Sequence, residues 1–181
     1  YALAEYHDNE AKFPTPAIPD MGNAIAVPAS SANVVHDSEV STAFHQLVDA
    51  WTTQSNGELR ISCVEGSVPD ALATLEITEA RMSLLTSGEA LAWLTWAGAS
   101  GGAHGRRRGN ALGRDAAWWT VAALTGQTSN WPLSGEDSMT AVNSLQWFWW
   151  DANEATTGWN VCLCIHHADR NRSCALLLTD K

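Results

Sequence analysis

Long apolar runs and basic residues are both scarce in this chain of 181 residues. No apolar run approaches the roughly 18 residues of a membrane-spanning helix, which argues against a membrane protein. Lysine and arginine number ten against twenty aspartates and glutamates, so the formal net charge is −10. A protein that binds duplex nucleic acid needs a basic face to displace counterions from phosphates. The charge balance therefore argues against that class too.

Cysteine is also sparse, since four residues do not make the dense disulfide framework of a small secreted domain. No basic stretch followed by an apolar core marks a signal peptide at the N-terminus. These two absences predict a cytoplasmic protein. Tryptophan, in contrast, is abundant: ten indoles, in a chain that is 45% apolar, predict a tryptophan-rich core.

The periodicity of apolar residues divides the chain into an irregular arm or linker over residues 1–36 and a single domain over residues 37–181. The arm holds four of the six prolines and keeps no regular period. Apolar residues recur at helical spacing from residue 38 onward, and a second helix is predicted after Thr86 and Glu89, which have capping-box spacing. A third helical pattern ends at Leu124. Alternation predicts strands over residues 59–63, 80–84, 145–150, 159–166 and 172–179. We expect an α+β fold, with a mostly antiparallel sheet of about five strands packed against three to four helices.

Residues 98–114 contain six of the thirteen glycines and four of the ten basic residues. If this segment is a loop before a helix, its glycines let backbone N–H groups converge on an anion. Arginine side chains then add bidentate contacts to phosphate or carboxylate. The predicted ligand-binding residues are Gly101, Gly102, Gly105, Arg106, Arg107, Arg108 and Arg114. The segment thus predicts a module that binds an anionic small molecule or an acidic protein surface.

An enzyme is the alternative, acting on a phosphoester or another anionic substrate. His104 would be its acid–base group, because imidazole titrates near neutral pH, and the arginines would stabilise developing charge. This alternative requires a pocket that holds His104 and a second polar partner, such as Asp115 or Glu136.

A structural interpretation of the same glycines is also open, and it does not exclude the functional one. Gly105, Gly109, Gly113 and Ala117 are spaced four residues apart, which would place them on one face of a helix from about Ala103 to Leu124. A stripe of small residues lets another backbone approach closely, at a cost of about 1 kcal/mol per glycine relative to alanine.

The stretch Gly-Gly-Ala-His-Gly-Arg-Arg-Arg-Gly at residues 101–109, with the helix Ala116 to Leu124 after it, resembles an uncharacterised family of actinobacterial proteins. The pieces Trp150 to Ala152 and Thr157 to Trp159 fit the same resemblance, which covers about residues 85–165. The resemblance implies a bacterial, cytoplasmic protein. It assigns no activity and no catalytic residue.

A cysteine–histidine cluster near the C-terminus is the second candidate site. Cys162, Cys164 and His166 alternate along a predicted strand and so share one face, and a turn at residues 168–170 would set Cys174 opposite Cys164. Three sulfurs and an imidazole could form a tetrahedral zinc shell, which leaves open a small structural zinc domain, and a Cys164–Cys174 bridge is a further alternative. Neighbours on one strand face stand about 7 Å apart, however, so these cysteines could simply fill the sheet face.

Overall fold

The structure is a computed structural model that describes residues 5–7, 10–12, 15–152 and 158–181. Strands β1 (Glu5–His7) and β2 (Glu10–Lys12) form a separate antiparallel ribbon. The main sheet has seven strands and only antiparallel pairs. Its spatial order is β3 (Ile25–Ala26), β6 (Glu79–Leu85), β7 (Leu145–Asp151), β8 (Trp159–His167), β9 (Arg172–Asp180), β5 (Glu58–Glu65) and β4 (Asn33–Val34). The predicted α+β class with an antiparallel sheet is confirmed.

The number of elements differs from the prediction. The described residues form six α-helices and the seven-stranded sheet, where three to four helices and about five strands were expected. The two unpredicted strands of the main sheet, β3 and β4, are two residues long, too short to show any alternation. They come from the predicted arm and pair with β6 and β5. The division of the chain at residue 36 stays a prediction.

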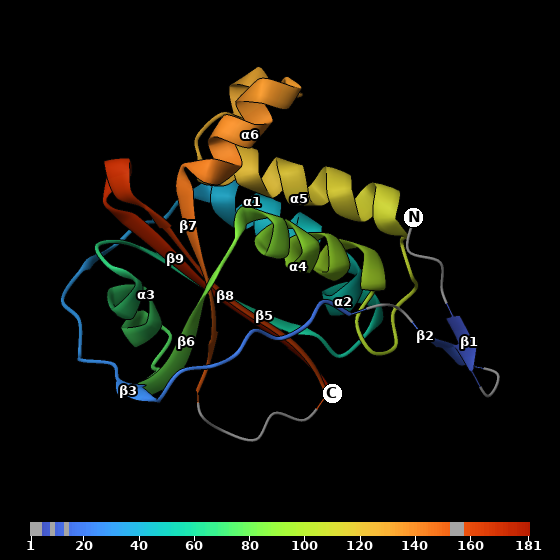
Figure 1. The fold of residues 1–181 in the computed structure, drawn as a ribbon, viewed down its shortest axis with the longest axis horizontal. Coiled ribbons are helices and arrows are strands. Elements are labelled where there is room, and N and C mark those ends of the chain that lie inside the picture. The colour runs from blue at the N-terminus through green and yellow to red at the C-terminus, as the bar shows by residue number, and fades with distance from the viewer. Residues whose placement is uncertain (1–4, 8–9, 13–14, 153–157) are drawn as a thin grey trace.

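Helices cover both faces of the sheet unequally (Figure 1). Five helices pack on one face: α1 (Ser38–Leu47), α2 (Asp49–Gln54), α4 (Ser87–Ser100), α5 (Asn110–Leu124) and α6 (Gly135–Asn143). Among the helices of the described residues, α3 (Val68–Thr74) alone packs on the other face, where Val64, Leu72 and Trp150 are buried together. Helix α5 lies alongside α4 and α1, so these three helices form a layer over the sheet.

Local capping signals in the sequence position the helix starts. The Asp37 carboxylate accepts hydrogen bonds from the N–H groups of Glu39 and Val40, both at 3.1 Å, and so caps α1. The Thr86–Glu89 capping box forms in full at the start of α4. These interactions satisfy backbone donors that the first turn of a helix leaves without partners.

Tryptophans dominate the larger core, as the composition predicted. Trp51, Trp93, Trp96, Trp147 and Trp149 are all buried between the helical layer and the sheet. Trp51 and Trp96 pack edge-to-face with ring centroids 5.4 Å apart, and the Trp51 indole N–H donates to the carbonyl of Ala97 at 2.9 Å. Buried indoles need such partners for their polar edge, and this one fixes α2 against α4. Within the described ranges, none of the helices has the length and apolarity required to cross a bilayer.

Candidate functional site: an arginine-lined hollow and groove

The glycine–arginine segment is a loop up to Gly109 and a helix from Asn110 onward. Gly101 and Gly102 adopt positive φ angles of 77° and 73°, and Gly109 has φ of 85°. Because side chains other than glycine rarely adopt this region, α4 ends at Ser100 and α5 cannot begin before Asn110. The expected helix from about Ala103 is therefore wrong over its first seven residues, and the loop interpretation holds there.

The glycine stripe survives only within the helix. A Cβ atom built on Gly113 would collide with the carbonyl oxygen of Thr95 and lie 2.8 Å from the Cβ atom of Ala99, and one on Gly98 would lie 3.1 Å from the Gly113 Cα atom. Helices α4 and α5 therefore approach closely at this point. Gly105 and Gly109, in contrast, lie in the loop that precedes α5.

Side chains from two distant segments, the end of α2 and the end of β9, hold the loop in place. The buried Asp180 carboxylate accepts from the Ala103 N–H at 2.7 Å, Ser55 Oγ from the His104 N–H at 3.1 Å, and Gln54 Oε1 from the Arg106 N–H at 3.2 Å. Gly105 fits against α2 because it has no side chain: a Cβ atom there would lie 2.6 Å from the Ala50 carbonyl oxygen. The backbone that carries the arginines is thus fixed by the fold.

Arg107 has a structural role. Its guanidinium donates to the carbonyls of Ser100 and Gly102, the latter at 2.6 Å, and its Cζ atom lies 4.7 Å from the centroid of the Trp159 ring. Burial lowers the pKa of this guanidinium. Carbonyls at a helix C-terminus attract cations, so Arg107 caps α4 and packs on an indole.

Arg106 and Arg108 face a hollow beside α2. Arg108 donates to the Gln46 carbonyl at the end of α1, at 3.2 Å, and the Arg106 side chain is exposed. Within the described part of the chain, no carboxylate forms an ion pair with either of them. The hollow has a volume of about 310 Å³ and is lined by Asp49, Gln54, Arg106, Arg107, Arg108 and Leu112.

A larger groove continues from this hollow between α1 and α5. The groove has a volume of about 580 Å³ and shares Asp49, Arg108 and Leu112 with the hollow. From there it follows α5 past Asp115 to two tryptophans, Trp119 and Trp131, whose rings pack edge-to-face with centroids 5.5 Å apart. The remaining lining residues are Thr42, His45, Gln46 and Ala116.

Two predicted site residues lie elsewhere. Arg114 lines a different hollow, of about 500 Å³, together with Trp96 and Trp118. His104 is exposed and lines neither the arginine hollow nor the groove, although Asp115 lies in the groove. Neither the hollow nor the groove therefore combines His104 with Asp115 or Glu136.

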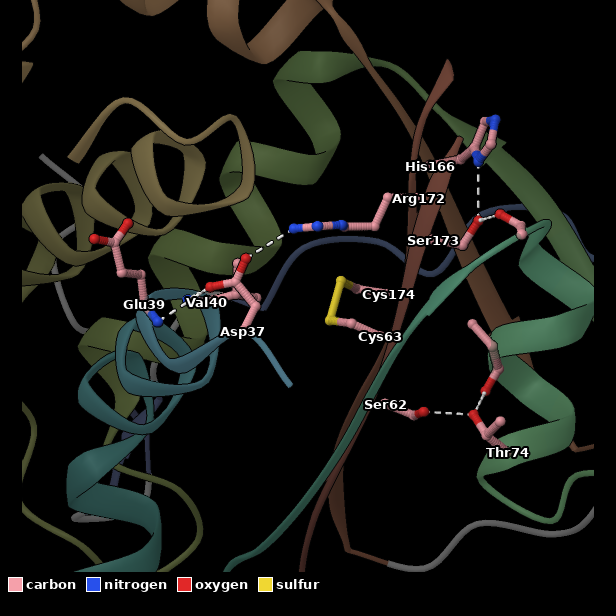
Figure 2. Close-up of a disulfide and its surroundings, with 12 residues drawn as sticks. Asp37, Glu39, Val40, Ser62, Cys63, Thr74, His166, Arg172, Ser173 and Cys174 are labelled. Carbon is pink, nitrogen blue, oxygen red and sulfur yellow. Dashed lines mark hydrogen bonds and ion pairs between the residues drawn. A yellow bond between two sulfur atoms is a disulfide. The ribbon is translucent and has the colours of Figure 1, made fainter. Parts of the chain in front are cut away.

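The cysteine–histidine cluster is divided between the two faces of the sheet. Cys174 forms a disulfide with Cys63 on the neighbouring strand β5, on the face that carries α1 (Figure 2). Cys162 and Cys164 are buried on the opposite face, next to α3. The predicted position of Cys174 opposite Cys164 in the sheet is wrong by one residue, because the strand register places Ala175 opposite Cys164. Cys63, the true partner, lies 111 residues away in the sequence.

His166 has a hydrogen-bonding role on that second face. The Ser173 hydroxyl donates to the Gly66 carbonyl at 2.7 Å, so its oxygen accepts from Nδ1 of His166 at 2.9 Å (Figure 2). Burial raises the pKa of the Cys162 thiol to about 12 and that of Cys164 well above its usual value, which opposes the thiolate form that binds zinc. Among the described residues, no three His, Cys, Asp or Glu side chains are grouped to hold a metal.

Sequence reasoning missed the residues that complete the hollow and the groove. Asp49, Gln54 and Trp131 come from α2 and from the loop before α6, and no spacing links them to the arginines.

The family comparison matches residues 1–181 to a model described as a family of unknown function (DUF6183). No curated protein and no solved structure matches the chain.

Proposed function

We propose from the geometry that this chain, which belongs to DUF6183, is a ligand-binding module for an anion. The family match confirms the predicted membership of an uncharacterised family and assigns no reaction. One observation carries the proposal: Arg106 and Arg108 extend from a braced loop into one hollow, and neither has a carboxylate partner within the described residues. In a molecule with net charge −10, these side chains concentrate positive charge at one place.

The rigidity of the loop supports binding. Hydrogen bonds that the loop N–H groups donate to Asp180, Ser55 and Gln54 fix its backbone before any ligand arrives, so little conformational entropy is lost on association. A guanidinium presents two parallel N–H donors to a phosphate or carboxylate. The concave shape and volume of the hollow favour a small anionic molecule over an acidic protein surface.

The enzyme alternative has less support than the binding module. The proposed acid–base group, His104, lines neither the arginine hollow nor the groove, whereas the arginines alone are sufficient for electrostatic binding.

Isothermal titration with inorganic phosphate tests the proposal. We expect saturable binding that Arg106→Ala or Arg108→Ala weakens at least tenfold, since a charged hydrogen bond contributes about 1.5–3 kcal/mol. Arg114→Ala is the matched control: it removes the same charge from the same segment, but from a different hollow. Equal weakening by all three variants would indicate general electrostatic attraction, and absence of binding to the native protein would reject the site.

A further inference from the structure

The arginine hollow and the adjoining groove form one continuous surface with three kinds of side chain in sequence. Asp49, Arg108 and Leu112 line both, so a ligand seated on the arginines extends directly into the groove. Guanidinium groups lie at one end with Asp49 beside them, Asp115 follows, and Trp119 and Trp131 lie at the other end. This order constrains the ligand more than the arginines alone.

The length of the groove excludes a bare anion as its full occupant. Leu112, Asp115 and Trp119 are spaced three to four residues apart, so they lie on one face of α5. With a rise of about 1.5 Å per residue, Leu112 and Trp119 are separated by roughly 10 Å along the helix. An inorganic phosphate held by Arg106 and Arg108 would leave Asp115, Trp119 and Trp131 without contact.

The middle of the groove requires hydrogen-bond donors. Asp49 and Asp115 are exposed, and neither carboxylate forms an ion pair in the part of the chain that the structure describes. Ionised carboxylates only accept hydrogen bonds, so they repel a second phosphate and attract hydroxyl groups. Neighbouring sugar hydroxyls suit this environment, as in the recognition of a ribose by an acidic side chain.

The far end offers aromatic surface. Trp119 and Trp131 are half-buried, so each ring keeps part of its surface accessible from the groove. Planar bases stack on indole rings, and the stacking tolerates different bases because each has a π-face. Leu112, half exposed at 51%, adds apolar surface between the two ends.

We infer that the site takes a nucleoside monophosphate, with the phosphate at Arg106 and Arg108, the sugar at Asp49 and Asp115, and the base at Trp119 and Trp131. This inference rests on the proposed anion-binding function and deepens it. A di- or triphosphate fits less well, because its additional charge would approach the two aspartates.

Calorimetric titration with a graded set of probes tests the inference: inorganic phosphate, ribose 5-phosphate, adenosine and adenosine 5′-monophosphate. We expect the mononucleotide to bind at least tenfold more tightly than ribose 5-phosphate and than adenosine. Trp131→Ala should abolish the advantage over ribose 5-phosphate and leave the affinity for ribose 5-phosphate unchanged. Trp118→Ala, in the hollow of Arg114, is the matched control and should have no effect.

A measurement on the native protein avoids dependence on the tryptophan variants. In a nitrogen-15 correlation spectrum, the indole signals of Trp119 and Trp131 should shift with adenosine 5′-monophosphate and remain in place with inorganic phosphate. If phosphate binds in an Arg106-dependent manner but the nucleoside adds no affinity and shifts no indole signal, the inference is overturned and the anion site stands. If no probe binds, both fail. Tighter binding of a short peptide with a free C-terminal carboxylate would also overturn the inference.

Discussion

The loop of residues 101–109 and the β8–β9 hairpin each carry a cluster of polar side chains that stands out in the sequence, and their structures depend on different constraints. In the loop, glycines with positive φ fix the backbone locally, and the neighbouring arginines reach one hollow. In the hairpin, strand register decides which side chains meet, and a shift of one residue moves Cys174 to the other face. Local backbone constraints can therefore be recognised in a sequence more easily than cross-strand partners.

Removing the disulfide should produce the largest effect. Because Cys63 and Cys174 are 111 residues apart, their bond restricts the unfolded chain strongly. We expect Cys63→Ala combined with Cys174→Ala to lower the free energy of unfolding by about 3–5 kcal/mol, or the melting temperature by about 10 °C. Thermal unfolding under non-reducing conditions measures this loss.

The control is Cys162→Ala combined with Cys164→Ala, which removes two buried sulfurs without breaking a bond. This variant should lose clearly less stability. A reducing agent should bring the native protein down to the level of the first variant. Detection of four free thiols in the oxidised native protein would contradict the assigned pairing.

Crowding the loop should have the next largest effect. A methyl group at Gly105 would collide with the Gly101 carbonyl and press on that of Ala50, and both carbonyls belong to backbone that cannot yield cheaply. We expect Gly105→Ala to destabilise the protein by about 2–3 kcal/mol, as overpacking does elsewhere, and to weaken anion binding with it. Urea denaturation measures the first effect.

Gly135→Ala is the control for that substitution, since a Cβ atom at Gly135 meets nothing within 4 Å and this glycine does not adopt a positive φ. It should leave stability within about 0.5 kcal/mol of the native value. Equal stability of the two variants would show that the loop yields easily, which would remove the rigidity on which the binding site depends.

The smallest effect concerns the reactivity of the two free cysteines, Cys162 and Cys164, toward alkylating agents. Since burial raises the pKa of Cys162 to about 12 and that of Cys164 well above the usual value, both remain protonated thiols at pH 8. Thiolate is the form that reacts with alkylating agents. We therefore expect iodoacetamide to modify neither residue in the folded protein and both after denaturation, as mass spectrometry of digested samples would show. Rapid labelling of folded protein would place these side chains in contact with solvent.

Much of the fold could be predicted because its signals are local. The five long strands, the cap at Asp37 and the capping box at Thr86 all follow from spacing within a few residues. The break between α1 and α2 could not be predicted, because Val48, where helical geometry is interrupted, carries no helix-breaking signal. The arginines of the candidate site could be predicted, because they are adjacent in the sequence. Asp49 and Trp131 could not, because only tertiary packing brings them to the arginines.

The short strands β3 and β4 have a consequence for the behaviour of the sheet. Both come from residues 25–34, yet they occupy the two opposite edges, so this single segment crosses the face that carries α3. Ser30 attaches it there by donating to Asp70 of α3 at 2.6 Å. Unpaired sheet edges invite pairing with other molecules, and here one strap of chain pairs with two residues of β6 and two residues of β5. Removal of residues 1–36 would therefore take away both outermost strands and leave β6 and β5 as the edges of the main sheet.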